Sequence, residues 1–210
     1  MQFLIKLICL NLSVLAFAAS PQLEDIRHLQ TMLNSERIEY FFGSYGVEIL
    51  SQAASDCSET RISKLYSLHD GQKITRTLAI VRYASPVSPS LETVHNNILA
   101  GASIGAAFKN AGWQLIKEPV FFGEIPLEET LRKWMQVESA QNASLQIYDL
   151  KVANATTPKI FYCRIIEIHS PLYLHTNLLS ALYPETFSVY READAQLLES
   201  IQEILKSLPN

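Results

Sequence analysis

One serine of the chain has the sequence setting of a hydrolase nucleophile. Residues 101–105 read Gly-Ala-Ser-Ile-Gly and satisfy the Gly-x-Ser-x-Gly pattern. Asp149, followed by His169 or His175, completes the chain order Ser, Asp, His. A nucleophile elbow also needs a strand that leads into the serine, whereas the residues before Ser103 are typical of a helix. A helix face of small residues that packs on a sheet is therefore the alternative interpretation.

The histidines and cysteines do not form a metal-binding pattern. The five histidines include no pair at the i, i+4 spacing of a helical zinc site, and Glu167-x-His169 is too short a signal. The cysteines lack a Cys-x-x-Cys spacing, and the chain has no nucleotide-binding fingerprint. We therefore expect neither a metal nor another cofactor.

The N-terminus has the pattern of a secretory signal peptide. Lys6 precedes an apolar run over Leu7–Ala19, which contains an Ala-Phe-Ala sequence that ends at Ala18. The run is shorter than the ~20 apolar residues that a membrane helix needs, and Pro21 follows it. We expect residues 1–18 to be removed, and the protein to be exported to the periplasm or the medium without an integral membrane segment.

Charge bounds the class of partner. Removal of the leader, with its one lysine, changes the formal net charge from −4 to −5. A mildly acidic chain without a basic run is not expected to bind nucleic acid or an anionic membrane surface. A small-molecule ligand remains compatible with this charge, and the oligomeric state is left open.

Two cysteines, Cys57 and Cys163, remain once the leader is removed. In an oxidising compartment they are candidates for a disulfide bond. Such a bond would close a loop of about a hundred residues and constrain the unfolded chain by ~4–5 kcal/mol. Two separate thiols, with Cys163 filling core volume, are the alternative, because spacing alone does not place two Cα atoms within reach.

One hairpin is the strongest local prediction. Asp70-Gly71, a dipeptide that accepts positive φ in a two-residue turn, lies between the strand-like runs Arg61–Leu68 and Lys73–Tyr83. Ile38–Leu50 also alternates with a period of two, which predicts a long strand that bends at Gly43 and Gly46.

Helical periodicity and further alternation predict the remaining elements. They are a helix from Ser20-Pro21 to about Asn34, a helix from Ser88-Pro89 to Gly112, a strand over Trp113–Phe122, a helix over Leu127–Val137, strands over Leu145–Val152 and Lys159–His169, a helix over Glu192–Leu208, and loops over Ser51–Thr60 and Ser139–Ser144. Hairpins with helices that do not alternate strictly with strands indicate an α+β fold. Without repeats or a long linker, residues 19–210 are expected to form one domain.

Three stretches of the chain resemble a known family. They are Leu-Tyr-Ser-Leu-His-Asp-Gly-Gln at 65–72 with Arg-Thr-Leu-Ala-Ile at 76–80, Gly-Ala-Ser-Ile-Gly at 101–105, and Ile165–Ile168 followed by Ser-Pro-Leu-Tyr at 170–173. Their content and order are similar to those of bacterial chorismate lyase and of the related effector-binding domains on one class of bacterial transcription regulators. With the preceding strand, they span most of the chain after the leader.

The resemblance implies a fold and one binding residue. It implies a six-stranded antiparallel sheet with helices that cover one side, and an internal pocket that in the lyase takes an aromatic carboxylate without a cofactor. An arginine on the second hairpin strand binds the ligand carboxylate in that family, and Arg76 falls at the matching place. A guanidinium suits this role because it stays charged and donates in a bidentate fork. An exposed position on the same face as Arg82 is the alternative for Arg76.

The acid of the lyase is not matched. The family uses a glutamate on the late strand, and the position that matches it best here is Arg164. An arginine cannot supply a proton at neutral pH. Glu167 lies three residues further on and points to the opposite face of a regular strand, unless a bulge turns it.

These observations lead to one expected function and three alternatives. We expect an exported domain that binds a small carboxylate-bearing ligand in an internal pocket, and the resemblance to the lyase implies that this ligand is aromatic. The candidate binding residues are Arg76, Arg164 and Glu167. The alternatives are an active lyase of the chorismate lyase type, a secreted serine hydrolase that uses Ser103, and a non-catalytic envelope protein that recognises another protein.

Overall fold

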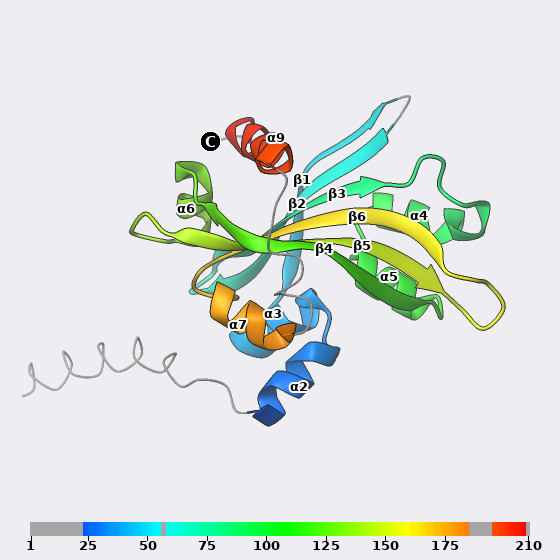
Figure 1. Ribbon diagram of the computed structural model, residues 1–210, viewed down its shortest axis with the longest axis horizontal. Helices are drawn as coiled ribbons and strands as arrows, with labels where there is room; N and C mark the ends of the chain where they lie inside the picture. Colours follow the sequence, from blue (N-terminus) through cyan, green and yellow to red (C-terminus); the bar gives the residue numbers. More distant parts are fainter. Residues whose placement is uncertain (1–22, 56–57, 185–194, 209–210) are drawn as a thin grey trace, which may run out of the picture. The chain divides into compact units, whose positions relative to one another are not determined.

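The computed structural model describes residues 23–55, 58–184 and 195–208 (Figure 1). Contacts divide the chain into two units, residues 1–31 and residues 32–210. The described part of the first unit is the helix α2 (Leu23–Thr31), at whose end the Thr31 hydroxyl donates to the His28 carbonyl. The second unit contains the sheet and all the other described elements, and so it positions the candidate site.

Six antiparallel strands form one sheet in the order β1-β2-β3-β6-β5-β4 (Figure 1). The strands are β1 (Gly46–Ser55), β2 (Ser58–His69), β3 (Gln72–Tyr83), β4 (Gln114–Pro126), β5 (Asn142–Ala153) and β6 (Ile160–His169). The α+β prediction with a six-stranded antiparallel sheet is confirmed. The predicted hairpin is also confirmed, because β2 and β3 are joined by Asp70 and Gly71 at φ values of 48° and 77°.

Each face of the sheet carries its own hydrophobic core. On one face, called here the α4/α5 face, residues such as Val81 and Ile165 pack with α4 (Glu92–Leu99) and α5 (Ile104–Asn110). On the opposite face, called the α6/α9 face, Leu78 and Ile166 pack with α6 (Glu129–Met135) and α9 (Ala195–Lys206). The resemblance implied helices on one side of the sheet, and the structure has helices on both faces. On the second face, α6 and α9 lie within the helices predicted over Leu127–Val137 and Glu192–Leu208.

The segment Ile38–Phe42 is helical, so the prediction of a strand from Ile38 was wrong. The helix α3 (Asn34–Phe42) begins where the Leu33 amide donates to the Glu36 carboxylate, and it ends at Gly43 with φ 70°. It buries Asn34, Arg37 and Ile38, which share one face at helical spacing. The alternation of Ile38, Tyr40 and Phe42 suggested a strand. Apolar residues two positions apart also occur in short helices, so this pattern does not distinguish the two.

Two other sequence predictions are corrected. The expected loop over Ser51–Thr60 is occupied by β1 and β2, which pair Ser51 with Ile62 and Ala53 with Thr60. These strand ends are polar and lack the apolar alternation that predicts a strand. They pair through backbone hydrogen bonds at the exposed edge of the sheet and do not depend on burial. Similarly, β5 begins at Asn142, within the loop expected over Ser139–Ser144.

The second predicted helix is interrupted. The segment forms a short 3₁₀ turn η2 (Pro89–Leu91) and the helices α4 and α5, which are separated by a break that contains Gly101 with φ 113°. A positive φ suits a glycine and ends a regular helix. The structure also adds α7 (Thr176–Leu182), while the predicted start of the last helix at Glu192 lies outside the described residues.

Candidate functional site

The α4/α5 face contains a partly enclosed cavity of about 90 Å³. The start of α3, the start of α5 and all six strands contribute to its wall. Half of the lining side chains are apolar. The polar and charged ones are Asn34, Ser35, Tyr45, Arg61, Ser63, Ser103, Lys117, Tyr148 and Glu167. A concave site that combines apolar walls with converging polar groups is a usual setting for a small molecule.

Strand order places the charged groups around this cavity. Arg61 on β2 stands in a cross-strand row with Val81 on β3 and Ile165 on β6. Glu167 lies two residues further along β6, and Lys117 comes from β4 at the far edge of the sheet. Adjacent strands lie ~4.8 Å apart, so the two cations approach the cavity from opposite sides and Glu167 lies between them.

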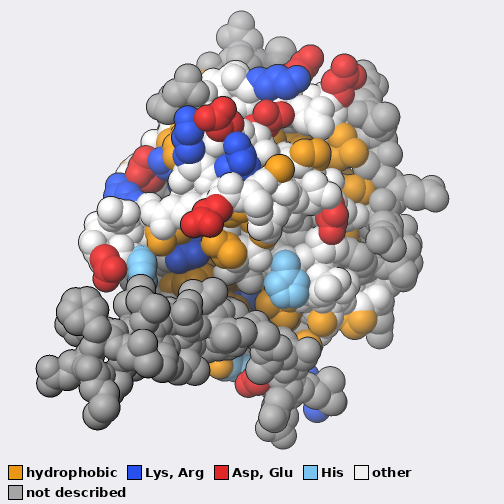
Figure 2. Space-filling model, turned by 90° about the vertical axis from the view of Figure 1, so that its left-hand side faces the viewer, with side chains coloured by type: hydrophobic (Ala, Val, Ile, Leu, Met, Phe, Trp, Pro, Cys, Tyr) orange, Lys and Arg blue, Asp and Glu red, His pale blue; other side chains and the backbone are white. Residues whose placement is uncertain are grey.

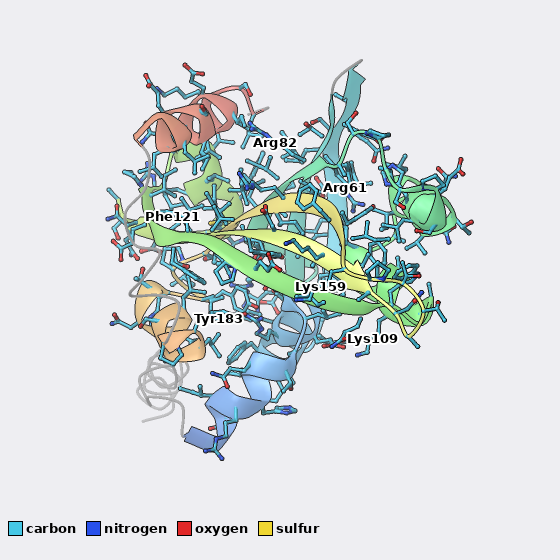
Figure 3. The ribbon with its side chains drawn as sticks, turned by 45° about the vertical axis from the view of Figure 1, so that its right-hand side comes forward. Arg61, Arg82, Lys109, Phe121, Lys159 and Tyr183 are labelled. Carbon is cyan, nitrogen blue, oxygen red and sulfur yellow. The ribbon has the colours of Figure 1, made fainter. Side chains whose placement is uncertain are left out.

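Arg61 is buried without a charged partner. Its side chain extends from β2 toward the junction of α4 and α5 (Figure 3), where Nη1 donates to the carbonyls of Ile98 at 2.9 Å and Ala102 at 3.1 Å. The residue is 2% exposed, and its Nε has no hydrogen-bond partner. Among the described residues it forms no ion pair. A buried guanidinium without a counter-ion is costly, and an anion in the cavity would offset that cost.

Lys117 is the second cation of the cavity. Its Nζ lies 4.6 Å from the centroid of the Tyr148 ring, and burial raises the pKa of that tyrosine well above its usual value. Lys117 also forms no ion pair within the described ranges. Its neighbour Glu118 does form one, with Lys151 at 2.6 Å. Lys117 therefore contacts an aromatic face, whereas its neighbour Glu118 is held in an ion pair.

Glu167 belongs to a buried polar cluster behind the cavity. It is 5% exposed, and its Oε1 accepts from Asn34 Nδ2 at 3.2 Å. Asn34 Nδ2 also donates to Thr77 Oγ1 at 3.2 Å, and Asn34 Oδ1 accepts from the Tyr173 hydroxyl at 2.8 Å. One asparagine at the start of α3 thus connects two strands and the segment after β6. This network fixes the position of the Glu167 carboxyl group.

His169 is the neutral member of this cluster. Burial lowers the pKa of its fully buried ring to about 4. Nδ1 lies 3.0 Å from Thr77 Oγ1, and Nε2 lies 3.8 Å from Glu167 without a hydrogen-bond partner. Near pH 7 the ring is therefore uncharged, and the contact with Glu167 is not an ion pair.

The structure places the three sequence-predicted binding residues apart, and only Glu167 lines the cavity. Arg76 is buried at 7% exposure, so the exposed alternative does not hold. Its Nε donates to Ser67 Oγ at 2.8 Å, and its guanidinium carbon lies 3.7 Å from the centroid of the Phe42 ring. Burial lowers the pKa of Arg76 to about 10, which leaves it charged at neutral pH.

Arg164 lies on the α6/α9 face and away from the cavity. Its Nε and Nη2 donate to the two carboxylate oxygens of Asp149 at 2.7 and 3.1 Å. The prediction that Arg164 and Glu167 occupy opposite faces of β6 agrees with this arrangement. The Arg164 guanidinium is therefore already paired with a carboxylate.

Ser103 lines the cavity, but it is not the nucleophile of an assembled triad. It stands immediately before α5, and α4 ends at Leu99, so no described strand enters the serine. Asp149 lies on the opposite face with Arg164. His175 accepts the Leu178 amide at the start of α7. Ser103 instead forms a hydrogen bond with Tyr45, whose pKa burial raises.

Several expectations concern residues outside the described part. The leader over residues 1–18 and Cys57 are among them, so the disulfide between Cys57 and Cys163 stays a prediction. Cys163 itself is buried, and burial raises the pKa of its thiol. In the described part of the chain, no group of three His, Cys, Asp or Glu side chains could hold a metal ion. No described helix has the length and hydropathy of a membrane span.

Arg61, Lys117 and Asn34 were not identified from the sequence. The alternation of Leu115 and Lys117 on one face of a predicted strand was an available signal for Lys117. Arg61 and Asn34 carried no comparable local signal. No protein-family model matches the chain, and no curated protein sequence matches it closely enough to count as a relative. The similarity to chorismate lyase therefore stays a resemblance.

Proposed function

We propose that this protein is an exported domain that binds a small carboxylate-bearing molecule in the cavity of the α4/α5 face. The observation that carries the proposal is the pair of cations, Arg61 and Lys117, which line this cavity without ion-pair partners among the described residues. The unpartnered Nε of Arg61 supports it further. A carboxylate would supply both the missing charge and the missing acceptor.

The apolar walls define the rest of the ligand. Leu65, Val81, Leu115 and Ile165 lie around the charged groups, so the ligand carries an apolar body next to its anionic end. Such burial contributes about 25 cal/mol for each Å² of apolar surface, which adds to the charge attraction. In this proposal Arg61 takes the anion-binding role that the resemblance assigns to Arg76.

The proposed function predicts that carboxylates stabilise the protein through Arg61 and Lys117. Propionate and benzoate are expected to raise the melting temperature of the wild type, as measured by differential scanning fluorimetry and calorimetric titration. Arg61→Lys keeps a donor for the helix carbonyls, and Lys117→Gln removes the second charge. Both should weaken binding by about tenfold or more, since a charge-assisted hydrogen bond contributes ~1.5–3 kcal/mol.

Lys109→Gln is the matched control for these two variants. Lys109 is exposed on α5 and pairs with Glu36 at 2.7 Å, so its removal should leave carboxylate binding unchanged. Equal loss in all three variants would mean that general charge, and not the cavity, attracts the anion. No stabilisation of the folded wild type by any carboxylate would refute the proposed function.

A lyase is the second candidate, because a carboxyl group does line the cavity. Glu167 is 5% exposed, is fixed by Asn34, and lies on the late strand as the acid of the lyase family does. The test is release of pyruvate from chorismate by the wild type but not by Glu167→Gln. Carboxylate binding without pyruvate release would leave the binding function and remove the lyase.

Export is tested separately from binding. Expression of the full chain in a bacterial host should give a periplasmic protein whose mature N-terminus is Ala19, as read by mass spectrometry of the intact protein. A cytoplasmic product that retains Met1 would contradict export and would leave the cavity proposal untouched.

A further inference from the structure

We propose that the cavity takes the zwitterion of a small aliphatic amino acid, with its carboxylate at Arg61 and its ammonium group at Glu167. The inference rests on the proposed function, because Arg61 must bind the carboxylate in both. It adds a second charged contact, and it names the class of ligand.

Two buried side chains of opposite charge line the same cavity. Arg61 is 2% exposed and Glu167 is 5% exposed. Within the described ranges no ion pair joins them, and the one charged-type contact of Glu167 is with His169 at 3.8 Å. Burial lowers the pKa of His169 to about 4, so this ring carries no charge near pH 7. Each buried charge thus lacks an ion-pair partner, which costs free energy.

The hydrogen bonds of the Glu167 carboxyl group involve one of its two oxygens. Oε1 accepts from Asn34 Nδ2 at 3.2 Å, whereas Oε2 accepts no hydrogen bond from the residues that the structure describes. The charge of Arg37 also acts on Glu167, but the Arg37 guanidinium donates to the Met32 carbonyl and the Tyr183 hydroxyl. An ammonium group at Oε2 would supply both a hydrogen-bond donor and the opposite charge.

The register of the sheet brings the two charges to one site. Ser63 on β2, Ala79 on β3 and Glu167 on β6 are cross-strand partners, and Arg61 lies two residues from Ser63 on the same face of β2. Only two strand spacings of ~4.8 Å separate β2 from β6, and Ala79 between them has a methyl side chain. Burial raises the pKa of Tyr45, Arg61 opposes that shift and Glu167 adds to it, so both charges act on the same part of the wall.

The size of the cavity limits the rest of the ligand. A closed cavity of ~150 Å³ holds benzene, whereas this cavity measures about 90 Å³. Leu65, Val81 and Ile165 line it beside the charged groups. A short aliphatic side chain therefore suits the enclosed space better than an aromatic ring. Alanine, which has a methyl side chain, is the probe for this class.

Three small compounds test the zwitterion in the wild-type protein. L-Alanine carries both charges, propionate lacks the ammonium group, and ethylamine lacks the carboxylate. Calorimetric titration should show that alanine binds about tenfold or more tightly than either of the other two, since each charge-assisted hydrogen bond contributes ~1.5–3 kcal/mol. This comparison does not require any variant to fold.

A charge-removing variant assigns the ammonium contact to Glu167. Glu167→Gln keeps an oxygen that accepts from Asn34, but it removes the negative charge. In this variant propionate should bind more tightly than alanine, because the ammonium group would then be buried without a counter-ion. Glu118→Gln is the matched control. Glu118 is 43% exposed and pairs with Lys151, so its removal should preserve the preference for alanine.

The two proposals fail in different ways. Propionate that binds the wild type as tightly as alanine would overturn the amino acid and leave the proposed function in place. Absence of binding by every carboxylate, alanine included, would overturn the proposed function itself. A preference for alanine that persists in Glu167→Gln would overturn the inferred contact, because the ammonium group would then bind elsewhere.

Discussion

Charged side chains around the cavity and charged side chains on the α6/α9 face have different environments. On the α6/α9 face, Arg164 binds Asp149 with both side chains partly exposed, and Lys64 lies 2.8 Å from Glu48. The side of the molecule in Figure 2 likewise shows cationic and anionic side chains close together. On the α4/α5 face, Arg61 is 2% exposed without an ion pair in the described ranges, and Glu167 is bonded to a neutral amide.

This difference separates stabilising charges from functional ones. Exposed pairs keep much of their hydration, so each contributes ~0–1 kcal/mol and costs little. Buried charges lose their hydration, and hydrogen bonds or a ligand must offset that loss. The buried charges Arg61 and Glu167 are therefore expected to reduce stability in the absence of a ligand, which is typical of a binding site.

The largest expected effect is at Asn34, which holds the buried cluster together. Asn34→Ala leaves Glu167, Thr77 and Tyr173 without their amide partner in a buried place. We expect the free energy of unfolding to fall by about 4 kcal/mol, measured by urea denaturation. Asn142→Ala, at an exposed amide bonded to Glu124, is the control and should change it by under ~0.5 kcal/mol. Similar losses in the two variants would remove the distinction between the faces.

The next effect is the pH dependence of stability that His169 confers. Burial lowers the pKa of His169 from 6.5 to about 4, so the unfolded chain binds this proton more readily than the folded protein does. Its contribution is complete above about pH 6.5 and is lost as the pH falls through 6.5 to 4. The loss amounts to roughly 3 kcal/mol, since each pKa unit corresponds to about 1.4 kcal/mol.

The measurement is the free energy of unfolding from about pH 7.5 to about pH 4.5 for the wild type and for His169→Gln. The variant should be less stable at the upper end and should show a smaller decline between the two values. Parallel curves for the two proteins would show that other groups cause the acid sensitivity.

A smaller effect distinguishes the two buried arginines. Ser67→Ala leaves the Nε of Arg76 without its acceptor, so the free energy of unfolding should fall by about 2 kcal/mol. Because Arg76 does not line the cavity, the stabilisation by propionate should not change. Ser90→Ala, in the exposed Ser88–Ser90 contact, is the control and should affect neither quantity. Loss of the propionate effect in Ser67→Ala would return the anion-binding role to Arg76.

Local chemistry made some elements predictable from sequence. Asp70-Gly71 determines its own turn, and the apolar periodicity of β4, β5, β6 and α6 follows directly from which faces are buried. The segment Ile38–Phe42 fits both a helix and a strand by its apolar residues. The glycine after Phe42 and the burial of Asn34 and Arg37 determine that the segment is a helix. That burial depends on partners distant in the sequence, such as Thr77 and Tyr183.

The site could be predicted only in part, because it depends on strand order. Glu167 was identified on β6, and its face followed from counting along one strand. Arg61 and Lys117 are 56 positions apart in the sequence, yet both line one cavity. They do so because β3, β6 and β5 lie between β2 and β4 in the sheet. No local pattern encodes that order. Conversely, the guanidinium of Arg76 has the chemistry to bind a carboxylate, but in the folded protein it packs against the Phe42 ring.

The smallest expected effect is at the exposed pair, and it completes the comparison of the two faces. Asp149 and Arg164 are joined at 2.7 Å, but their side chains are 22% and 43% exposed. A double-mutant cycle with Asp149→Ala and Arg164→Ala should therefore give a coupling free energy below about 1 kcal/mol, and 0.5 M salt should reduce it further. The same salt should hardly change the effect of Asn34→Ala, since buried hydrogen bonds are little screened. A coupling as large as the Asn34 effect would mean that exposure does not separate the two classes of charge.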